Sequence, residues 1–585
     1  MRRNILKILA LIAALAALCA FICACNDLSD TQDSQTDQPS EDATDNPKLP
    51  DAIVGNEFII FENGVYNCNI VCSDTASDAE KDIYNQLRNK LKSLTGVNPT
   101  FTTDFVAFND TGANRETPAI LIGETNFEES RGVYSELNYG TGVIELVGNK
   151  LVVAFPSLDI GNILYVKLLS SLESKSADKV SVNLDILPYS KVANPSLAAL
   201  PVYPEKQFET LDGGDDTSFL RLSNVDEEDF EAYQKMLTDT GYTLSGTREA
   251  GPVSCATYIK GENYVYTYYK SYTHTIRAIV GPVSHLPNAP EKELEEITEP
   301  SFTMVSQSDS DIGLGMVFRL TDGRFVIVDG GAYYSDDLVY KALKSQAVTE
   351  EITIAAWFLT HAHSDHHGGF TEFVNKHKDE VKIESVIFNF AATERYKAID
   401  GEEDNYGMTE LRQKIRRDLP DTKFIKPHTG QTIEFGDTVF EIMYTAEDFY
   451  PSNFEYLNDT SLVVRAHFAS KSILMLADAT HQAGNILVDT YLDYLQSDMV
   501  QLAHHGIWAS TAALYNRVNA AVLLWPSNSP NAANWIDDSS VKAALAPARD
   551  VYLPNGSTIT INFPYEFIDN KNEFIDKHRA LNSAE

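Results

Sequence analysis

Hydrophobic and polar positions in the first folded stretch of the chain follow two different periods. Apolar runs such as residues 58–61 and 151–155 are typical of buried strands. Residues 79–95 instead repeat apolar positions every three or four residues, which predicts an amphipathic helix, and Gly96 follows as a helix-ending residue. Similar strand and helix patterns continue downstream. We therefore predict an α+β accessory domain over residues 51–190.

A second pattern follows a linker that is dotted with prolines. Residues 226–241 predict an amphipathic helix, and residues 257–281 alternate like consecutive antiparallel strands. Together they predict a small α+β domain over residues 205–285. The strand region carries the tyrosines Tyr264, Tyr266, Tyr268, Tyr269 and Tyr272. Aromatic residues are common in ordinary sheets, so we expect these side chains to pack within the sheet, with a sugar-stacking platform as the alternative.

The longest stretch, residues 300–565, combines many strand patterns with helices between them. Its apolar strand pattern over residues 353–360 is followed by an amphipathic pattern that starts after His366 and predicts a helix. Gly368 and Gly369 are expected to let the chain turn into this helix. The chain as a whole is therefore predicted to be a multidomain α/β protein.

The first 24 residues have the pattern of an export signal. Basic residues precede an apolar run over residues 8–24, which is shorter than the roughly 20 residues needed to span a bilayer comfortably. The run ends in Ile22-Cys23-Ala24-Cys25, which resembles the lipobox of bacterial lipoproteins. This resemblance implies a signal peptide over residues 1–24 and lipidation of the Cys25 thiol. An uncleaved anchor helix is the alternative, and both place the rest of the chain outside the cytoplasm.

The composition after the signal, and of the whole chain, limits the partners. Residues 25–50 contain many Asp, Ser and Thr residues and almost no large apolar side chain, which predicts a disordered acidic tether. The 585-residue chain has a formal net charge of −38. Proteins that bind nucleic acids carry basic surfaces, so this charge argues against nucleic acid as a partner. We expect a protein held at the cell membrane by its lipid anchor.

One segment combines the residues of a metal centre. The strand pattern ends at residue 360 and is followed by His361, His363, Asp365 and His366. Imidazoles and carboxylates are the ligands of zinc and of neighbouring metals. Two histidines one residue apart at a strand end can share one ion, and the Asp-His pair can face a second ion. Because burying so many ionisable groups without such a role is costly, the segment predicts a metal site.

The spacing His-x-His-x-Asp-His resembles the signature of the metallo-β-lactamase superfamily. Three later segments extend the resemblance over roughly residues 301–564: Phe325 to Gly331 with Asp329, Leu474 to Asp478, and Gln501 to Gly506 with His504 and His505. The resemblance implies a C-terminal αββα sandwich preceded by the two α+β domains. It also implies a hydrolase that uses two divalent metal ions, expected to be zinc, with manganese or iron as alternatives.

Carried over to this sequence, the family pattern implies a ligand for each position. The first ion would be held by His361 and His363, the second by Asp365, His366 and His504, and Asp478 would bridge the two. We choose His504 over His505 because it follows the strand as the family's ligand does. His505 is then expected to be a neighbouring group or a proton donor, and Asp365 to orient the attacking hydroxide. The first ion is left one protein ligand short.

A further segment favours one branch of the superfamily. The sequence from Asn458 to Val464, followed by Asp478 and by the His-His-Gly motif, resembles the hydrolase domain of competence-type DNA-uptake proteins. That branch lacks the usual third-motif histidine, and His428 is expected to be a surface loop residue. Where the branch has serine after His-His-Gly, this chain has Ile507, although Ser510 matches a later serine. This departure leaves the substrate open.

The chemistry of such a centre indicates the reaction. Two cations about 3.5–4 Å apart lower the pKa of a bridging water towards 7 and supply hydroxide at neutral pH. We expect hydrolysis of phosphoesters or phosphodiesters, in a small molecule or an envelope polymer. The alternative is a surface protein that binds glycan or cell envelope and has a weakly active or silent metallo-domain. β-Lactam hydrolysis is disfavoured by the missing histidine, and DNA handling by the charge.

Overall fold

The protein is described by a computed structural model. The structure describes residues 52–99, 101–105, 116–176, 178–189, 192–204, 207–291, 294–306, 312–396, 399 and 408–582. The predicted signal peptide, the predicted lipidation site Cys25 and the predicted tether lie outside the described residues. In the described ranges, no helix is both long and apolar enough to cross a bilayer.

The N-terminal region contains two sheets. In spatial order, the first consists of β1 (Ile53–Val54), β2 (Glu57–Glu62), β10 (Lys179–Asn183) and β9 (Leu172–Ser176), with β3 (Val65–Tyr66) beside β2. The second consists of β11 (Val192–Ala193), β7 (Thr141–Val147), β8 (Lys150–Ala154), β6 (Ala119–Ile122), β4 (Asn69–Cys72) and β5 (Phe101–Thr103). The helices are α2 (Asp78–Thr95), α4 (Glu128–Glu136), α5 (Leu158–Ser170) and α6 (Pro195–Ala198).

Local sequence signals explain the longest of these helices. Ser77 and Glu80 form a capping box at the start of α2, and Gly96 ends the helix in a left-handed conformation with φ 73°. The helix therefore ends where the sequence predicts. Cys68 and Cys72 are buried and unbridged, because they pack in the apolar core beneath α2 rather than pairing with each other.

The middle region is one antiparallel sheet with a helix on one face. In spatial order its strands are β12 (Gln207–Gly214), β13 (Thr217–Ser223), β17 (Thr275–Pro282), β16 (Asn263–Lys270), β15 (Val253–Lys260) and β14 (Thr243–Ala250), and its helix is α7 (Glu227–Asp239). The tyrosines Tyr264, Tyr266, Tyr268 and Tyr269 are buried, whereas Tyr272 is 61% exposed. The expected role in sheet packing is confirmed for four of the five side chains.

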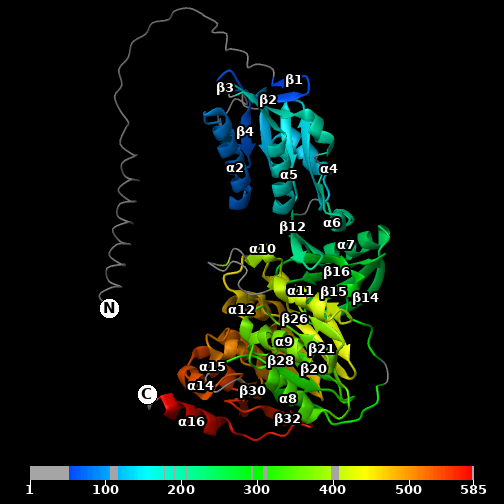
Figure 1. The fold of residues 1–585 in the computed structure, drawn as a ribbon, viewed down its shortest axis with the longest axis vertical. Coiled ribbons are helices and arrows are strands. Elements are labelled where there is room, and N and C mark those ends of the chain that lie inside the picture. Colours follow the sequence, from blue (N-terminus) through cyan, green and yellow to red (C-terminus); the bar gives the residue numbers. More distant parts are fainter. Residues whose placement is uncertain are drawn as a thin grey trace, which may run out of the picture. The chain divides into compact units, whose positions relative to one another are not determined.

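The C-terminal region contains two larger sheets (Figure 1, green to red). In spatial order, the first has β24 (Lys423–Ile425), β23 (Ser385–Ile387), β21 (Ile352–Phe358), β20 (Phe325–Val328), β19 (Met316–Arg319), β18 (Ser301–Met304) and β32 (Ile559–Asn562), with β22 (Val381–Ile383) beside β21. The second has β25 (Thr432–Phe435), β26 (Thr438–Tyr444), β27 (Val463–Phe468), β28 (Lys471–Met475), β29 (Met499–Gln501), β30 (Val522–Leu524) and β31 (Asp550–Tyr552).

Helices accompany both of these sheets. They are α8 (Asp336–Gln346), α9 (Ser364–His377), α10 (Thr393–Tyr396), α11 (Met408–Asp418), α12 (His481–Tyr491), α13 (Ala512–Val518), α14 (Ser529–Trp535), α15 (Ser539–Leu545) and α16 (Lys571–Asn582). The sequence prediction stops at residue 565 and therefore misses α16. Strands β18 and β32 pair antiparallel, so the beginning and the end of the predicted region lie side by side.

Strands of the first sheet place alternate side chains in different cores, as the two-residue period of a strand requires. In β20, Val326 belongs to the core between the sheets, whereas Ile327 belongs to the core beneath the helices. On that outer side, Trp357 of β21 packs against Phe370 and Phe373 of α9, with ring centroids 5.0 and 4.9 Å apart. The first sheet is thus covered by α9.

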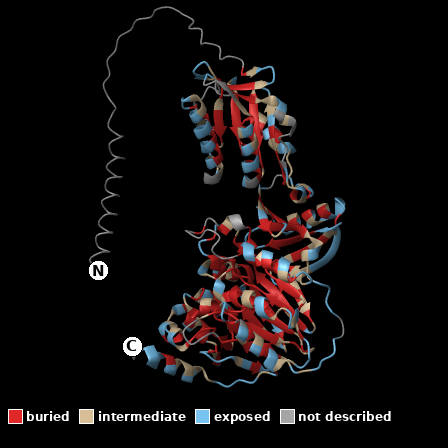
Figure 2. Cartoon of the chain, viewed as in Figure 1, coloured by how far each residue is buried: buried red, intermediate tan, exposed pale blue. Residues whose placement is uncertain are grey.

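The second sheet repeats this arrangement. In β28, Leu474 shares the outer core with Leu487 of α12, whereas Met475 belongs to the inner core. The two sheets meet through side chains such as Phe318 and Phe440, whose ring centroids are 5.4 Å apart. Figure 2 shows these strands as buried. Two sheets face to face, with helices outside, form the αββα sandwich that the sequence predicts.

Helix α9 begins earlier than predicted. Its first residue is Ser364, so Asp365 and His366 lie in its first turn. The two glycines that follow are inside the helix and do not form a turn into it. A Cβ on Gly369 would lie 2.0 Å from the carbonyl oxygen of Gly330, so these glycines allow close contact between α9 and the loop after β20.

The middle sheet joins the sandwich through buried polar contacts. The Tyr264 hydroxyl lies 2.6 Å from His428 Nε2, and His428 Nδ1 lies 2.9 Å from Glu447 Oε1. Lys270 pairs with Asp448 at 3.0 Å, and both side chains are buried. The prediction of a surface position for His428 is therefore wrong. The segment looks like an exposed loop in the sequence because the sheet that covers it is far away along the chain.

We expect Glu441→Gln to destabilise the protein, because Glu441 is a buried carboxylate between two arginines of different regions. It accepts hydrogen bonds from Arg248 (2.6 Å) and Arg465 (2.6 Å). Burial would raise the pKa of Glu441, but His467, Arg465, Tyr494 and Arg248 lower it to about 2. Removing one member of a buried pair costs about 3–5 kcal/mol, which chemical denaturation at pH 7 would measure.

The sign of this pH dependence follows from the depressed pKa. The stabilisation by the Glu441 carboxylate is present above the ordinary glutamate pKa of 4.5 and is lost as the pH falls towards 2. The difference in the free energy of unfolding between wild type and Glu441→Gln should therefore shrink over that interval. Glu434→Gln on the adjacent strand β25 is the matched control, because Glu434 is only partly buried and makes no ion pair with a described residue. Equal effects of the two substitutions would contradict this account.

Candidate metal centre

The predicted ligands meet because each follows the carboxyl end of a strand. His361 and His363 follow β21, and Asp478 follows β28. His504 and His505 lie in the short helical turn η6 (Ala503–Gly506) after β29. Strands β20 and β21 run parallel, as do β28 and β29, so the ends of these strands gather at one edge of each sheet.

Four side chains form a first group of potential ligands. Asp365, His366, Asp478 and His505 each offer one atom, and these atoms all lie within 4.8 Å of one another. His366 Nε2 is 3.1 Å and His505 Nε2 is 3.6 Å from Asp478 Oδ1. His505 Nε2 is also 3.2 Å from Asp365 Oδ2. This is the place where the sequence predicts the second ion.

A second group shares one residue with the first. His361, His363 and Asp478 also offer atoms within 4.8 Å of one another. His361 Nε2 lies 3.0 Å from His363 Nδ1 and 3.8 Å from Asp478 Oδ2. Asp478 therefore directs one carboxylate oxygen towards each group, which is the position that the sequence analysis assigned to a bridging ligand.

A buried aspartate orients the histidines of both groups. Asp329 is fully buried, with φ 56°, and its carboxylate accepts a hydrogen bond from His366 Nδ1 at 2.7 Å and another from the Thr360 hydroxyl at 2.7 Å. Because Thr360 donates its proton to Asp329, its oxygen is left to accept from His361 Nδ1 at 3.1 Å. Both imidazoles are thereby held with Nε2 towards the cluster. Metal-binding histidines commonly have such carboxylate partners.

His505, and not His504, belongs to the four-residue group, which corrects the sequence-based choice. His505 is buried, and its Nδ1 lies 3.0 Å from the carbonyl oxygen of Pro526. A carbonyl only accepts, so Nδ1 carries the proton and Nε2 faces the carboxylates. His504 and His505 both have positive φ, 50° and 54°, which turns the chain so that the second histidine points inward. Spacing along the sequence does not reveal that turn.

The carboxylates set the charge of the four-residue group. Burial would lower the pKa of His366, but Asp478, Asp329 and Asp365 hold it well above its ordinary value. Burial would likewise lower the pKa of His505, and Asp478 and Asp365 raise it instead. In the other group, burial together with His366 and His363 holds the pKa of His361 well below its ordinary value. The group around Asp478 Oδ1 therefore favours positive charge.

The polar atoms of this group fit a divalent ion. His366 Nε2, His505 Nε2 and Asp478 Oδ1 are buried and have no hydrogen-bond partner among the described residues. Leaving a buried polar atom unpaired costs about 1–3 kcal/mol, so three such atoms facing one another need a shared partner. Imidazole and carboxylate donors are those of zinc, manganese and iron sites, and the residues present therefore fit the expected metals.

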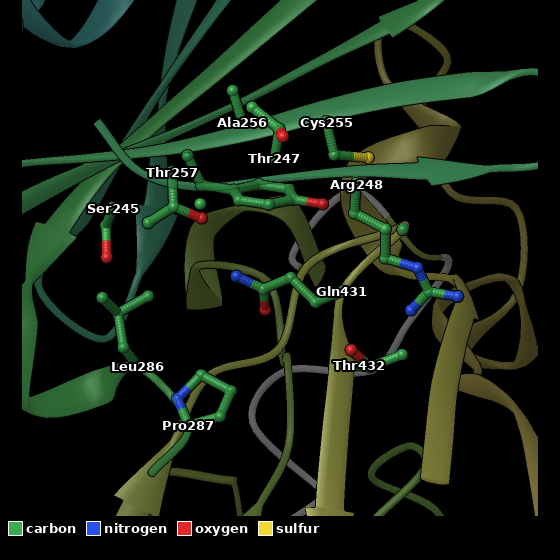
Figure 3. Close-up of a pocket in the computed structure, with 13 residues that line it drawn as sticks. Ser245, Thr247, Arg248, Cys255, Ala256, Thr257, Leu286, Pro287, Gln431 and Thr432 are labelled. Atoms are coloured by element: carbon green, nitrogen blue, oxygen red, sulfur yellow. The ribbon is translucent and has the colours of Figure 1, made fainter. Parts of the chain in front are cut away.

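A separate cavity lies away from this cluster. It has a volume of about 240 Å³ and is lined by residues of β14 and β15, among them Arg248 and Cys255, and by Gln431 and Thr432 of the sandwich. Figure 3 shows Gln431 and Thr432 opposite the side chains of the middle sheet. No residue of the metal cluster lines this cavity, and Arg248 is already paired with Glu441. This cavity is therefore not part of the candidate metal centre.

The role of Asp329 could not be predicted from the sequence, although the segment from Phe325 to Gly331 that contains it resembles a family motif. The available signal was an aspartate directly after a wholly apolar strand and directly before two glycines. A buried position for such a carboxylate requires partners, and histidines elsewhere in the chain were the candidates. The partners His366 and Thr360 lie more than 30 residues away, and only the fold brings them together.

Comparison with known proteins identifies the domain. Residues 311–520 match the family described as the metallo-beta-lactamase superfamily, so the C-terminal region of this multidomain α/β chain contains a metallo-β-lactamase domain. The family consists largely of metal-dependent hydrolases, and its fold binds divalent metals. A search of curated proteins found no match.

Solved structures with partial similarity were also found. The diiron β-hydroxylase CmlA from Streptomyces venezuelae is 14% identical over 44% of this chain and 45% of that chain, with a TM-score of 0.24. A Cronobacter sakazakii metallo-β-lactamase with a HARLDQ motif is 14% identical over 35% and 79%, with a TM-score of 0.23. A long-form RNase Z from yeast is 12% identical over 51% and 45%, with a TM-score of 0.25. This chain spans less than half the length of CmlA.

We expect Asp329→Asn to weaken metal binding without removing any ligand, because a neutral amide oxygen accepts from His366 Nδ1 less strongly than the carboxylate does. Loss of such a supporting hydrogen bond lowers metal affinity by about 10–100-fold. Competition with a chromogenic chelator measures the affinity. Asp421→Asn is the control, because Asp421 is exposed in a turn. Unchanged affinity in Asp329→Asn would show that the histidine positions do not depend on this carboxylate.

Proposed function

We propose that this chain is an extracytoplasmic, membrane-anchored, metal-dependent hydrolase that acts on phosphoesters or phosphodiesters. The observation that carries this proposal is the double cluster around Asp478, in which two groups of imidazole and carboxylate atoms share one carboxylate. The family match over residues 311–520 supports hydrolysis as the reaction class. The resemblance of the segment from Asn458 to Val464 to the competence-type branch supports phosphate esters as substrates.

Divalent ions held in this cluster would lower the pKa of water towards 7 and would polarise the oxygen of the scissile group. Asp365 is the carboxylate best placed to orient the attacking water, because its side chain is 31% exposed while Asp478 is 2% exposed. A water molecule can therefore reach Asp365 from solvent. Asp478 serves to hold the two groups of ligands together.

The proposed proton-donor role of His505 does not fit its surroundings. Its Nδ1 is bound to Pro526, and its Nε2 faces Asp365 and Asp478. Neither nitrogen is turned towards solvent, since the side chain is 1% exposed, and His505 is therefore better suited to binding metal. His504 is the more accessible histidine of the pair, with a side chain that is 28% exposed.

The charge of the centre and the expected location support phosphate esters as the substrate class. Two adjacent cations favour an anionic centre, which a phosphate ester provides. The sequence pattern of a lipidated N-terminus would place the domain outside the cytoplasm, where envelope polymers and small phosphate esters are available. The alternative of glycan binding by the middle sheet has less support, because four of its five tyrosines are buried.

The activity test compares the wild-type chain with Asp365→Ala. With bound divalent metal, the wild type should hydrolyse bis-p-nitrophenyl phosphate or p-nitrophenyl phosphate, and a chelator should abolish turnover. Loss of a group that positions a proton or water lowers the rate about 100-fold or more. Asp421→Ala is the matched control on an exposed turn. Turnover of a chromogenic cephalosporin without turnover of either phosphate ester would contradict the substrate proposal.

The membrane anchor is tested separately in a bacterial host. Cys25 should incorporate radiolabelled palmitate, and the full-length chain should sediment with the membrane fraction. Cys25→Ala should lose the label, because the thiol that would carry lipid is absent, and Cys23→Ala should keep it. Equal labelling of wild type and Cys25→Ala would show that the chain is not lipidated at this position.

A further inference from the structure

We propose that His504 is the third histidine ligand of the first ion, so that the consecutive histidines His504 and His505 serve different ions. This inference rests on the proposed metal-dependent function. It addresses a gap in the ligand set, because the group around His361 and His363 has only these two histidines and the shared carboxylate of Asp478.

The two oxygens of Asp478 divide the histidines of the cluster into two sides. Oδ1 lies near His366 Nε2 and His505 Nε2, at 3.1 and 3.6 Å. Oδ2 lies 3.8 Å from His361 Nε2 and 3.9 Å from His504 Nε2. His504 is therefore on the side of the first ion, although its neighbour along the chain is on the side of the second.

The spacing suits donors of one ion. Zinc–nitrogen and zinc–oxygen bonds of about 2.0–2.2 Å place neighbouring donors roughly 3–4 Å apart. The distance from His504 Nε2 to Asp478 Oδ2 lies within this range. His504 is not a member of the group whose atoms all lie within 4.8 Å of one another, so its ring must move towards His361 and His363 when an ion binds.

The side chain of His504 is free to make that movement, whereas its backbone is fixed. The His504 amide donates to the carbonyl of Ala477 at 3.0 Å, directly beside Asp478, and its own carbonyl accepts from the Ile507 amide at 2.8 Å. Its imidazole is 28% exposed and makes no hydrogen bond with the described residues. A small rotation of the ring can therefore bring Nε2 closer without disturbing η6.

The backbone of η6 explains how adjacent residues reach opposite sides of one carboxylate. His504 has φ 50° and ψ 44°, and His505 has φ 54° and ψ 16°. Two consecutive non-glycine residues in the left-handed region are uncommon and cost free energy, which is typical of functional sites. With His504 included, each ion would have three ligands of its own and one oxygen of Asp478.

A second buried donor lies in the segment just before β27. Ser461 is buried, and its hydroxyl has no hydrogen-bond partner among the described residues. A neutral hydroxyl is a weaker ligand than an imidazole for zinc, so we assign the position to His504. Ser461→Ala is included in the test for this reason.

The test is a titration of the metal-free, folded chain with Co²⁺, read by visible absorbance, together with the zinc content after dialysis. Wild type should bind two ions. His504→Ala should keep the second ion and bind the first ion at least about tenfold more weakly. His505→Ala should instead weaken binding of the second ion. Ser461→Ala and His274→Ala should behave like wild type, since His274 lies exposed in the turn between β16 and β17. Circular dichroism verifies that each variant is folded.

The outcomes separate this inference from the proposed function. Two ions bound with unchanged affinity in His504→Ala would overturn the inference, and the hydrolase proposal would stand. The same holds if that variant keeps both ions but loses turnover, because His504 would then be a proton donor. Loss of the first ion only in Ser461→Ala would assign the position to the serine. A wild-type chain that binds no ion would instead overturn the proposed function.

Discussion

The buried carboxylate of Asp329 is the contact on which the geometry of the candidate site depends. It accepts directly from His366 and, through the Thr360 hydroxyl, fixes His361, so one side chain orients a histidine of each ligand group. Its left-handed backbone, followed by Gly330, also lets α9 approach closely enough to bring Asp365 and His366 into place. Both ligand groups thus depend on one loop after a central strand.

The middle sheet belongs to the same structural unit as the sandwich that carries the candidate metal centre. Tyr264, Lys270 and Arg248 reach across to His428, Asp448 and Glu441, and most of these side chains are buried. Buried charges without partners are costly, so the sheet and the sandwich depend on each other. The middle sheet therefore supports the sandwich, and its buried tyrosines contribute to that packing.

The sequence predicts the strands, helices and ligand types well because these depend on local patterns. His361, His363, Asp365, His366 and Asp478 lie in the predicted cluster, and α2 ends before Gly96 as predicted. Prediction from the sequence fails where contacts between distant residues determine the position of a side chain. His428 is buried by a sheet more than 150 residues earlier in the chain, and the choice between His504 and His505 depends on backbone angles at the end of β29. The local sequence indicates neither the burial of His428 nor the choice between His504 and His505.

The central claim is that two divalent ions bind on either side of the Asp478 carboxylate. Anomalous diffraction from crystals of the metal-loaded protein, collected above and below the absorption edge of the bound metal, tests this most directly. The account predicts two peaks, one beside Oδ1 with His366 and His505 and one beside Oδ2 with His361 and His363. Peaks that do not contact Asp478, or no peak in this cluster, would contradict it.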